Sequence, residues 1–441
     1  MTPTTIGLVM LAGMLLLMAI RVPIAAAMFI PGALGYMVLA NDTALLNLLK
    51  GSSVARLTVY DLSVIPLFLL MGQFATQGGL SRALFNAASA FIGHIRGGLA
   101  MAAIMSAAAF GAVCGSSVAT SATITQVAYP QMKAHGYHGR LSTATLAAGG
   151  TLGILIPPSV PLVVYAILTE QNIAKLFAAA FIPGLLAMVG YIIVIAIYCR
   201  VRPDMATPSQ PVPWSERWKA LIGIWPIVLI FFVVFGGIYG GVFSPTEGAA
   251  VGAIGTFVAG LAQRELNLQA IERCFVGAAE TSAMVFMIFL GADMLNSSLA
   301  LTQMPANLAS WVSQLQVPPL LIVAFVLLFY IALGCVMDEL SMVLLTIPVL
   351  FPAIMGLDLW GLDPESKAIW FGILVLMMVG FGLIAPPVGL NVYVVNSIAK
   401  DVPMIETYKG VTAFLISDVI RVVLLLMFPV ITLGLVSAFF K

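Results

Sequence analysis

Apolar runs of roughly 18 or more residues recur along the whole chain, and a run of that length is enough for a helix to cross a bilayer. Of the 441 residues, 61% are hydrophobic and only 8% are charged. A soluble domain carries about 25% charged residues, so this chain cannot present a wetted surface on all sides. No stretch longer than about 20 residues is polar enough for a separate soluble domain. We therefore predict an all-α polytopic membrane protein.

The charge balance and the cysteines exclude several other classes. The net charge is +1 and Lys and Arg form no dense cluster, so no nucleic-acid partner is expected. The four cysteines lie far apart without a C-x-x-C pair, which is typical of small apolar helix residues. The first apolar run has no positive residue before it, and Arg21 follows it, so we expect a retained helix and not a cleaved signal peptide.

The apolar runs differ in how continuous they are. Full spans are expected at about 4–20, 23–40, 62–77, 141–168, 177–198, 221–242, 245–262, 279–300, 368–397 and 413–438, about ten transmembrane helices. Two further apolar stretches, 98–128 and 318–350, are interrupted by small and polar residues, and we expect them to be re-entrant hairpins. The amphipathic segments 80–95 and 303–316 precede them and are expected to brace the hairpins at the membrane surface.

With two hairpins, the loops sort by charge. One side carries thirteen basic residues: Arg21, Arg82, Arg96, Lys133, Arg140, Arg200, Arg202, Arg217, Lys219, Arg264, Arg273, Lys400 and Lys409. The other carries five: Lys50, Arg56, Lys175, Lys367 and Lys441. Because basic loops stay in the cytoplasm, both termini are expected to face outward, and the two hairpins enter from opposite sides.

The two halves of the chain repeat the same order of features. The first half reads "GAVCGSSVAT" from Gly111 and then "GGTLGILIPPSVPLVVYA" from Gly149. The second reads "GCVMDELSM" from Gly334 and then "GFGLIAPPVGLNVYVV" from Gly380. In both, a glycine lies four residues before a Pro-Pro pair. Since the hairpins enter from opposite sides, the repeats are inverted.

The Pro-Pro pairs predict where a site forms. Two prolines remove two amide donors and clash with the preceding turn, so a helix cannot continue through them. Broken backbone survives at membrane depth only where it is buried in protein or lines a polar cavity. Half-helix N-termini attract anions, and the freed carbonyls suit Na⁺. The sequence therefore predicts a binding site near the bilayer midplane.

Five motifs together resemble the large membrane subunit of a tripartite ATP-independent periplasmic (TRAP) transporter. They are "GSSVAT", "GTLGILIPPSVPLVVYA", "GGVFSPTEGAAVGA", "GCVMDELSMVLLTIPVLFP" and "IAPPVGLNVYVV", in the family's order and spacing. The resemblance implies a bacterial inner-membrane secondary transporter, not an enzyme, with an elevator mechanism driven by Na⁺ as coupling ion and no other cofactor. It also implies two partners, a periplasmic substrate-binding protein and a small four-helix membrane subunit, which we expect to be a separate chain.

The resemblance also indicates the site residues. One Na⁺ site is expected at Ser116, Ser117, Thr120, Gly150, Gly153 and Pro157, and a second at Gly334, Asp338, Ser341, Gly380, Gly382 and Pro386. These groups offer only oxygen ligands, which hard cations prefer. A small organic acid, of dicarboxylate or related type, is expected to contact Ser117, Ser159, Asp338, Ser341 and Asn391. No Lys or Arg is expected at that depth.

Three acidic positions leave alternatives open. Asp338 is either a Na⁺ or substrate ligand or simply the N-cap of the hairpin's second helix. Glu339 stands where the family's dicarboxylate-type branch is expected to have a small or neutral residue. Glu247 in "SPTE" is expected in the first turn of a helix, where it serves either the structure or a subunit contact. Arg421 lies inside the last span and is expected to pair with Glu280, Asp293, Asp418 or a partner helix.

We divide the chain into four segments: scaffold helices at 1–60, the first-repeat arm, hairpin and broken helix at 61–200, scaffold helices at 201–265, and the second-repeat counterpart at 266–441. The main alternative function is a stand-alone Na⁺-coupled divalent-anion carrier that needs no binding protein. A membrane-embedded enzyme is disfavoured because no paired catalytic groups or His clusters occur at midplane depth, and a primary pump because no nucleotide-binding loop occurs.

Overall fold

The computed structural model describes residues 2–440, apart from the side chains of residues 52–54, 56, 57 and 313, so Arg56 and Lys441 of the charge comparison lie outside it. Within these residues the chain is helical and has no strand, which confirms the predicted fold class. Five helices are long and apolar enough to cross a membrane, or up to seven if each sharply bent pair of helices forms one span.

The helices follow the order of the predicted segments. The first half contains α1 (Pro3–Ala19), α2 (Ile24–Leu39), α3 (Asp42–Leu57), η1 (Tyr60–Ser63), α4 (Val64–Gln77), α5 (Leu80–Ile92), α6 (Gly98–Cys114), α7 (Ser117–Ala134), α8 (Gly139–Leu155), α9 (Val160–Thr169) and α10 (Ile173–Val201). The second half contains η2 (Pro203–Met205), α11 (Trp214–Gly223), α12 (Trp225–Tyr239), α13 (Pro245–Ala262), α14 (Leu268–Leu301), α15 (Met304–Gln314), α16 (Pro319–Gly334), α17 (Glu339–Met355), α18 (Pro364–Gly382), α19 (Leu390–Ile398), α20 (Met404–Met427) and α21 (Val430–Phe439).

The interrupted segments behave as the Pro-Pro pairs predict. The spans expected at 141–168 and 368–397 are broken into α8 and α9 and into α18 and α19, and each break contains its Pro-Pro pair. The stretches expected to be hairpins form α6–α7 and α16–α17, and the two helices of each pair pack against each other. The two amphipathic segments form α5 and α15.

Three sequence predictions of secondary structure were wrong. The span at 413–438 is not one helix, because α20 ends at Met427 and α21 begins after Pro429, which has no amide hydrogen to continue the ladder. The loops expected after α2 and after α10 each contain a helix, α3 and α11. Both helices are much less apolar than the spans, so a search for long apolar runs passed over them.

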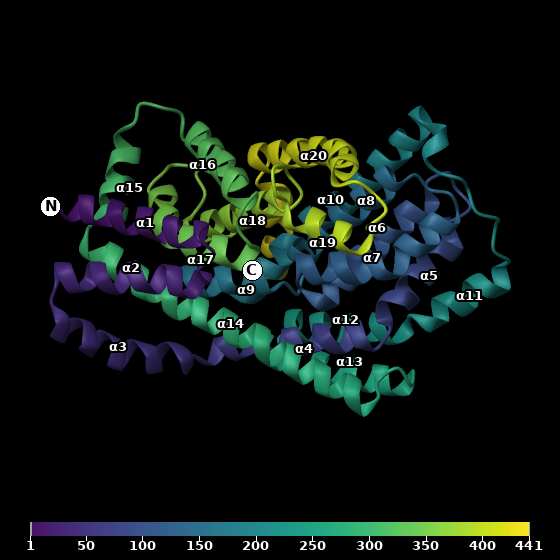
Figure 1. Ribbon diagram of the computed structural model, residues 1–441, viewed down its shortest axis with the longest axis horizontal. Helices are drawn as coiled ribbons and strands as arrows, with labels where there is room; N and C mark the ends of the chain where they lie inside the picture. The colour runs from purple at the N-terminus through teal and green to yellow at the C-terminus, as the bar shows by residue number, and fades with distance from the viewer. Residues whose placement is uncertain (1, 441) are drawn as a thin grey trace.

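The packing of the helices repeats in the two halves. Each of two matching contacts joins a helix of the first half to one of the second: α2 packs along α14, and α4 packs along α13. Glycines allow these close approaches: a Cβ added to Gly32 of α2 would lie 2.8 Å from the backbone of Leu295 in α14. We call α1, α2, α4, α12, α13 and α14 the frame. In Figure 1 α3, α4, α13 and α14 follow one edge of the molecule, while α9, α18 and α19 lie in its middle.

The hairpins and broken helices form the interior, and we call α6–α9 and α16–α19 the bundle. In the apolar windows of Gly139–Thr169 and of α18, 89% of the residues are buried, against 33% in α10. A helix with this little lipid-facing surface is surrounded by protein, so its broken backbone is shielded from hydrocarbon as membrane physics requires.

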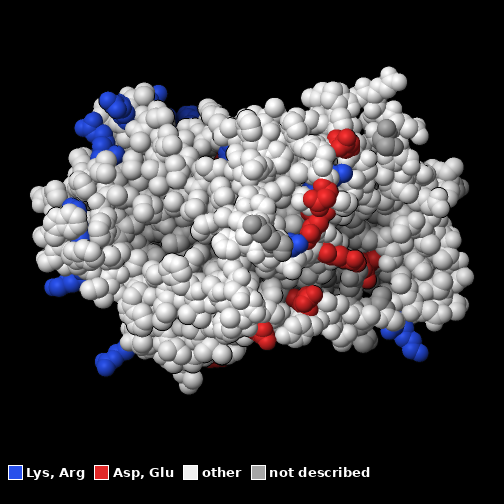
Figure 2. All heavy atoms as spheres, turned by 180° about the vertical axis from the view of Figure 1, so that it is seen from behind, with Lys and Arg blue, Asp and Glu red and all other residues white. Residues whose placement is uncertain are grey.

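Charged side chains are unevenly distributed over the surface. Figure 2 shows, on the face opposite that of Figure 1, most Lys and Arg side chains toward one end and the lower edge, while Asp and Glu gather around a hollow right of the centre. The basic end carries α5 and α11, which lie at the right-hand end in Figure 1. This asymmetry agrees with the loop charges, and the orientation of the termini stays a prediction.

Candidate substrate and ion site

The tip of the first hairpin is formed by Gly115 and Ser116. Gly115 ends α6 with φ +67°, a left-handed conformation that favours glycine, and Ser116 is extended and begins α7. The Gly115 carbonyl accepts a hydrogen bond of 3.2 Å from the Val160 amide, the first residue of α9. The tip is therefore fixed against the second half of the first broken helix, beside the Pro157-Pro158 break.

Glycines of α8 bring this tip against the first half of the same broken helix. A Cβ added to Gly153 would lie 2.7 Å from the Ser116 carbonyl oxygen and 2.8 Å from Thr120 Oγ1. A Cβ on Gly150 would collide with Ser121 Oγ. The structure thus brings together Ser116, Ser117, Thr120, Gly150 and Gly153 of the first expected Na⁺ site, and it adds Ser121, which the sequence analysis missed.

The second hairpin meets its broken helix in the same way. A Cβ on Gly382 would lie 2.5 Å from Gly334 Cα, and Cys335 Sγ lies 3.1 Å from the Pro386 carbonyl oxygen. The Gly389 amide donates to the Cys335 carbonyl oxygen at 3.4 Å. Gly334, Gly382 and Pro386 are therefore brought together.

Asp338 and Gly380 have more specific surroundings than the sequence suggested. Asp338 is the N-cap of α17, because its carboxylate accepts hydrogen bonds of 3.1 Å from the amides of Leu340 and Ser341 and a short one from the Ser341 hydroxyl. Capping is thus confirmed, and a Na⁺ role for Asp338 and Ser341 stays a prediction. Gly380 faces Thr151 of α8, so it packs the two broken helices together.

A chain of hydrogen bonds joins the two halves at the hairpin tips. Ser116 Oγ donates to Glu339 Oε1 at 3.3 Å. Asn391 Nδ2 donates to Ser117 Oγ at 2.6 Å and to the Ala147 carbonyl oxygen at 3.3 Å. Ser117 and Asn391, both expected to contact substrate, are therefore in direct contact, and Glu339 joins them through the neighbouring serine.

Several buried oxygen atoms around this chain have no hydrogen-bond partner: Thr120 Oγ1, Ser121 Oγ, Glu339 Oε2 and Asn391 Oδ1. Buried polar atoms are normally paired, so unpaired ones need an explanation. Oxygen ligands without competing N–H donors are what a hard cation requires, and the residues expected at the first Na⁺ site fit that ion. Ser159, the N-cap of α9, accepts from the Leu162 amide at 3.4 Å.

A cavity of about 710 Å³ adjoins the tip of the second hairpin. Its walls are mostly apolar side chains of α2, α3 and α14, and its polar lining residues include Asp293, Ser297 and Asp338. The cavity is therefore formed mainly by frame helices and α3, and it reaches the bundle at Asp338, one of two carboxylate-bearing residues on its wall.

A second polar network supports α8 from outside the site. Thr151 Oγ1 lies 3.1 Å from the Tyr191 hydroxyl, which donates to Asp418 Oδ2 at 2.9 Å, and Asp418 pairs with Arg421 at 2.8 Å. Of the three acidic partners considered for Arg421, the structure places Asp418 against it. Thr151 and Tyr191 were missed, since neither stands out within an apolar run.

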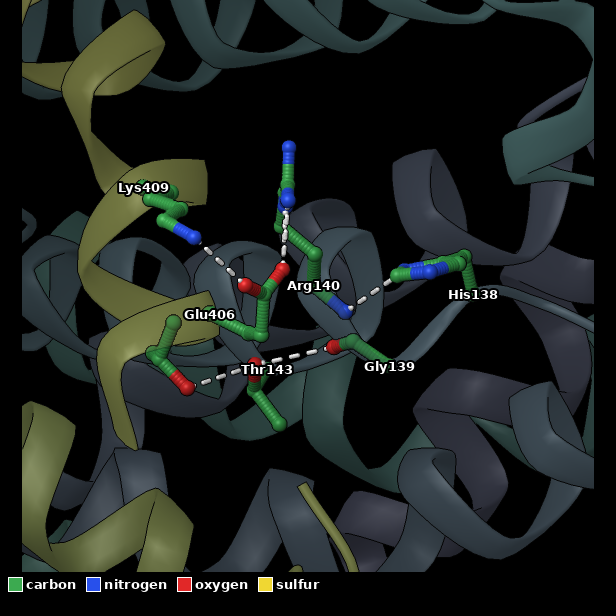
Figure 3. Close-up of polar contacts among 7 residues, drawn as sticks. His138, Gly139, Arg140, Thr143, Glu406 and Lys409 are labelled. Atoms are coloured by element: carbon green, nitrogen blue, oxygen red, sulfur yellow. Dashed lines mark hydrogen bonds and ion pairs between the residues drawn. The ribbon is translucent and has the colours of Figure 1, made fainter. Parts of the chain in front are cut away.

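Ion pairs hold the start of α8 to α20, as Figure 3 shows. Glu406 pairs with Arg140 at 2.5 Å and with Lys409 at 2.8 Å. Beside it, the Thr407 and Thr143 hydroxyls are 2.8 Å apart. Nearby, Lys133 of α7 pairs with Asp401 at 2.8 Å, and its hydrogen bond lowers the pKa of that carboxyl. The broken helix is thus anchored at its polar end as well as at its break.

Elsewhere, the helix start predicted at Glu247 is confirmed. Ser244 and Glu247 form a capping box, in which the Glu247 amide donates to Ser244 Oγ and the Ser244 amide donates to Glu247 Oε2. Glu247 therefore stabilises the first turn of α13 and is not part of the site at the hairpin tips.

Among solved structures, the chain resembles one described as "Crystal structure of the Alcanivorax borkumensis YdaH transporter reveals an unusual topology". The TM-score is 0.65 with 16% identity, over 88% of this chain and 89% of the other. At that identity the likeness shows a common fold and nothing more about function.

Sequence comparison gives closer relatives. The chain is 36% identical to the C4-dicarboxylate TRAP transporter large permease protein DctM of Pseudomonas aeruginosa, over 85% of this chain and 86% of the relative. It is 31% identical to the ectoine TRAP transporter large permease protein TeaC of Halomonas elongata, over 99% and 100%. The sialic acid relative SiaM of Vibrio cholerae is 29% identical over 92% and 93%.

The profile of one protein family covers nearly all of the chain. It is described as "Tripartite ATP-independent periplasmic transporter, DctM component", and it matches residues 11–431. The match includes both hairpins, both broken helices and the frame. The chain therefore belongs to the DctM family, the large permease component of tripartite ATP-independent periplasmic transporters.

Proposed function

We propose that this permease carries a small organic acid into the cell by Na⁺-coupled secondary transport, at the site between the two hairpin tips. The observation that supports this most directly is the chain of contacts from Glu339 through Ser116 and Ser117 to Asn391. It joins both repeats beside buried, unpartnered oxygens. Relatives are named for C4-dicarboxylate, sialic acid, ectoine and isethionate.

The proposed coupling rests on the oxygen-only character of the site. Na⁺ would be held by the hydroxyls and carbonyls that Gly150 and Gly153 bring together at the first tip. A second ion would lie near Gly334, Gly382 and Pro386. An anionic group held by Na⁺, hydroxyls and helix N-termini is released when Na⁺ leaves. This couples the transport of the substrate to that of Na⁺.

The proposed movement is an elevator step of the bundle against the frame. Two features support it: the hairpin tips are fixed to the broken helices by backbone hydrogen bonds, and the 710 Å³ cavity among the frame helices reaches the tip of the second hairpin at Asp338. A bundle whose parts are tied together can shift as one body while the frame stays in place.

Two partners belong to the proposal. A periplasmic binding protein would deliver the substrate, and a small four-helix membrane subunit would pack on the frame. The frame offers surface for this, since Phe232 of α12, Ile254 of α13 and Phe275 of α14 are each more than half exposed. The proposed location is the bacterial inner membrane.

Reconstitution in proteoliposomes tests the proposal. The chain, its small subunit and its binding protein are expected to take up a radiolabelled organic acid only with an inward Na⁺ gradient. Replacing external Na⁺ by K⁺ is expected to abolish uptake. Uptake that persists in K⁺ contradicts Na⁺ coupling, and uptake by the membrane part without binding protein favours the stand-alone carrier instead.

A further inference from the structure

Both helix N-termini at the hairpin tips already have a carboxylate of the protein itself. Ser116, the N-cap of α7, makes no capping bond with its own side chain. Glu339, from the other hairpin, reaches this end of α7 and accepts from Ser116 Oγ at 3.3 Å. Asp338 caps α17. The positions where a helix dipole would attract a carboxylate of the substrate are therefore taken by Glu339 and Asp338.

Glu339 is built into the site and does not simply face solvent. Its side chain is only 6% exposed, and its Oε2 atom is buried without a hydrogen-bond partner. The Ser117 amide at the start of α7 also faces this carboxylate, and the oxygen that makes no hydrogen bond of its own remains open to a further donor. Asn391 Oδ1, on the same chain of contacts, is a second buried acceptor without a donor.

Basic side chains do not balance these carboxylates. Among the described residues, the buried basic side chains are Lys367 and Arg421. Lys367 Nζ donates to the carbonyls of Met355 and Leu357, and Arg421 pairs with Asp418, so both are engaged elsewhere.

A dianion would therefore bring its second carboxylate against the carboxyl groups of Glu339 and Asp338, and adding negative charge there, out of water, is unfavourable. A hydrogen-bond donor with positive charge would meet the unpartnered Glu339 Oε2 and Asn391 Oδ1 instead.

We propose that this permease is selective for zwitterionic carboxylates: an ammonium or amidinium group lies against Glu339, while the substrate's carboxylate lies among Na⁺, Ser117 and Ser159. This inference rests on the proposed function and adds the substrate class. Glu339 is the residue that excludes dicarboxylates, because it holds the position that a second substrate carboxylate needs.

Matched ligand pairs test the inference on the purified full chain by thermal shift in NaCl. Each pair keeps the methylene spacer and exchanges one carboxylate for an ammonium group: succinate with 3-aminopropanoate, and glutarate with 4-aminobutyrate, within a series of zwitterions of two to six carbons. Wild type is expected to be stabilised by members of the zwitterionic series and not by their dicarboxylate counterparts.

Variants of Glu339 identify its part in the selectivity. Glu339→Gln removes the charge at constant shape, and it is expected to shift the ratio of half-saturating concentrations toward dicarboxylates by about tenfold or more. Glu339→Asp keeps the charge and is expected to retain the zwitterion preference. The control Glu272→Gln, on the exposed surface of α14, is expected to behave as wild type.

The outcomes separate this inference from the proposed function. If Na⁺ raises the melting temperature relative to K⁺ but dicarboxylates stabilise wild type, or neither series does, the inference is wrong and the proposed function stands. If Glu339→Gln loses the Na⁺ effect without a change in ligand preference, Glu339 is an ion ligand and the inference is also wrong. If Na⁺ has no effect on wild type, the proposed function itself fails.

Discussion

At the residue scale, the distinctive feature is a small set of buried hydroxyls that make no hydrogen bond. Thr120 Oγ1 lies at the first hairpin tip, against Gly153. Thr145 Oγ1, on α8, is equally buried and equally unpartnered. Unlike Thr120, it does not lie against any glycine of the described residues. A hydroxyl left unsatisfied costs stability, and a bound ion at Thr120 would offset that cost. Comparing Thr120 with Thr145 therefore distinguishes a hydroxyl that binds an ion from a hydroxyl that is merely left without a hydrogen bond.

Thr120→Val removes that hydroxyl and keeps the shape of the side chain. If Thr120 binds Na⁺, the Na⁺ concentration for half-maximal uptake is expected to rise about tenfold, because one ligand is lost. The melting temperature without Na⁺ is expected to stay or rise, since an unsatisfied polar atom has gone. Uptake against Na⁺ concentration in proteoliposomes measures the first effect. Thr145→Val is the control, and an equal change in both variants contradicts the assignment.

At the scale of elements, each half-site depends on how closely a hairpin tip approaches its broken helix. The approach is set by glycine: Gly153 faces the Ser116 backbone, and Gly382 faces Gly334. Backbone groups cannot move aside as a flexible side chain can, so there is no room for a methyl group at either position. The hairpin and the broken helix consequently act as one packed unit.

Gly153→Ala is expected to separate the first tip from α8. The added Cβ would lie 2.7 Å from the Ser116 carbonyl oxygen, and overpacking of this kind costs about 1–3 kcal/mol. Uptake is expected to fall at least about tenfold while membrane insertion stays normal. Gly236→Ala, where nothing lies within 4 Å of the added Cβ, is the control. Wild-type uptake by Gly153→Ala contradicts a site at this contact.

The breaks and hairpins could be predicted from sequence because their causes are local. Pro157 and Pro386 cannot donate a backbone hydrogen bond wherever the chain places them, and Gly115 marks a turn. The hydrogen bond from Ser116 to Glu339 could not be predicted from sequence, because it joins residues 223 positions apart through tertiary packing. The helix α3 was missed for another reason: it is much less apolar than the spans, and long apolar runs were the signal used to find helices.

At the scale of the whole molecule, orientation in the membrane decides which hairpin opens to which side. The predicted orientation rests on basic loop residues, and Figure 2 shows these side chains gathered toward one end of the molecule. Loop charge fixes orientation because translocating Lys and Arg across the bilayer is unfavourable. If this orientation is reversed, the acidic tip of the second hairpin faces the cytoplasm, and substrate would meet the two halves in the opposite order.

Single-cysteine labelling tests the orientation, because the four native cysteines are buried and should react slowly. Asp358 and Gln210 are both exposed, the first in the loop expected outside and the second in the loop expected in the cytoplasm. In intact spheroplasts, a membrane-impermeant maleimide is expected to label Asp358→Cys but not Gln210→Cys. After lysis both are expected to react, which serves as the control for exposure. Since both loops belong to one chain, the opposite pattern means that the whole molecule, and with it the acidic hairpin tip, is inverted.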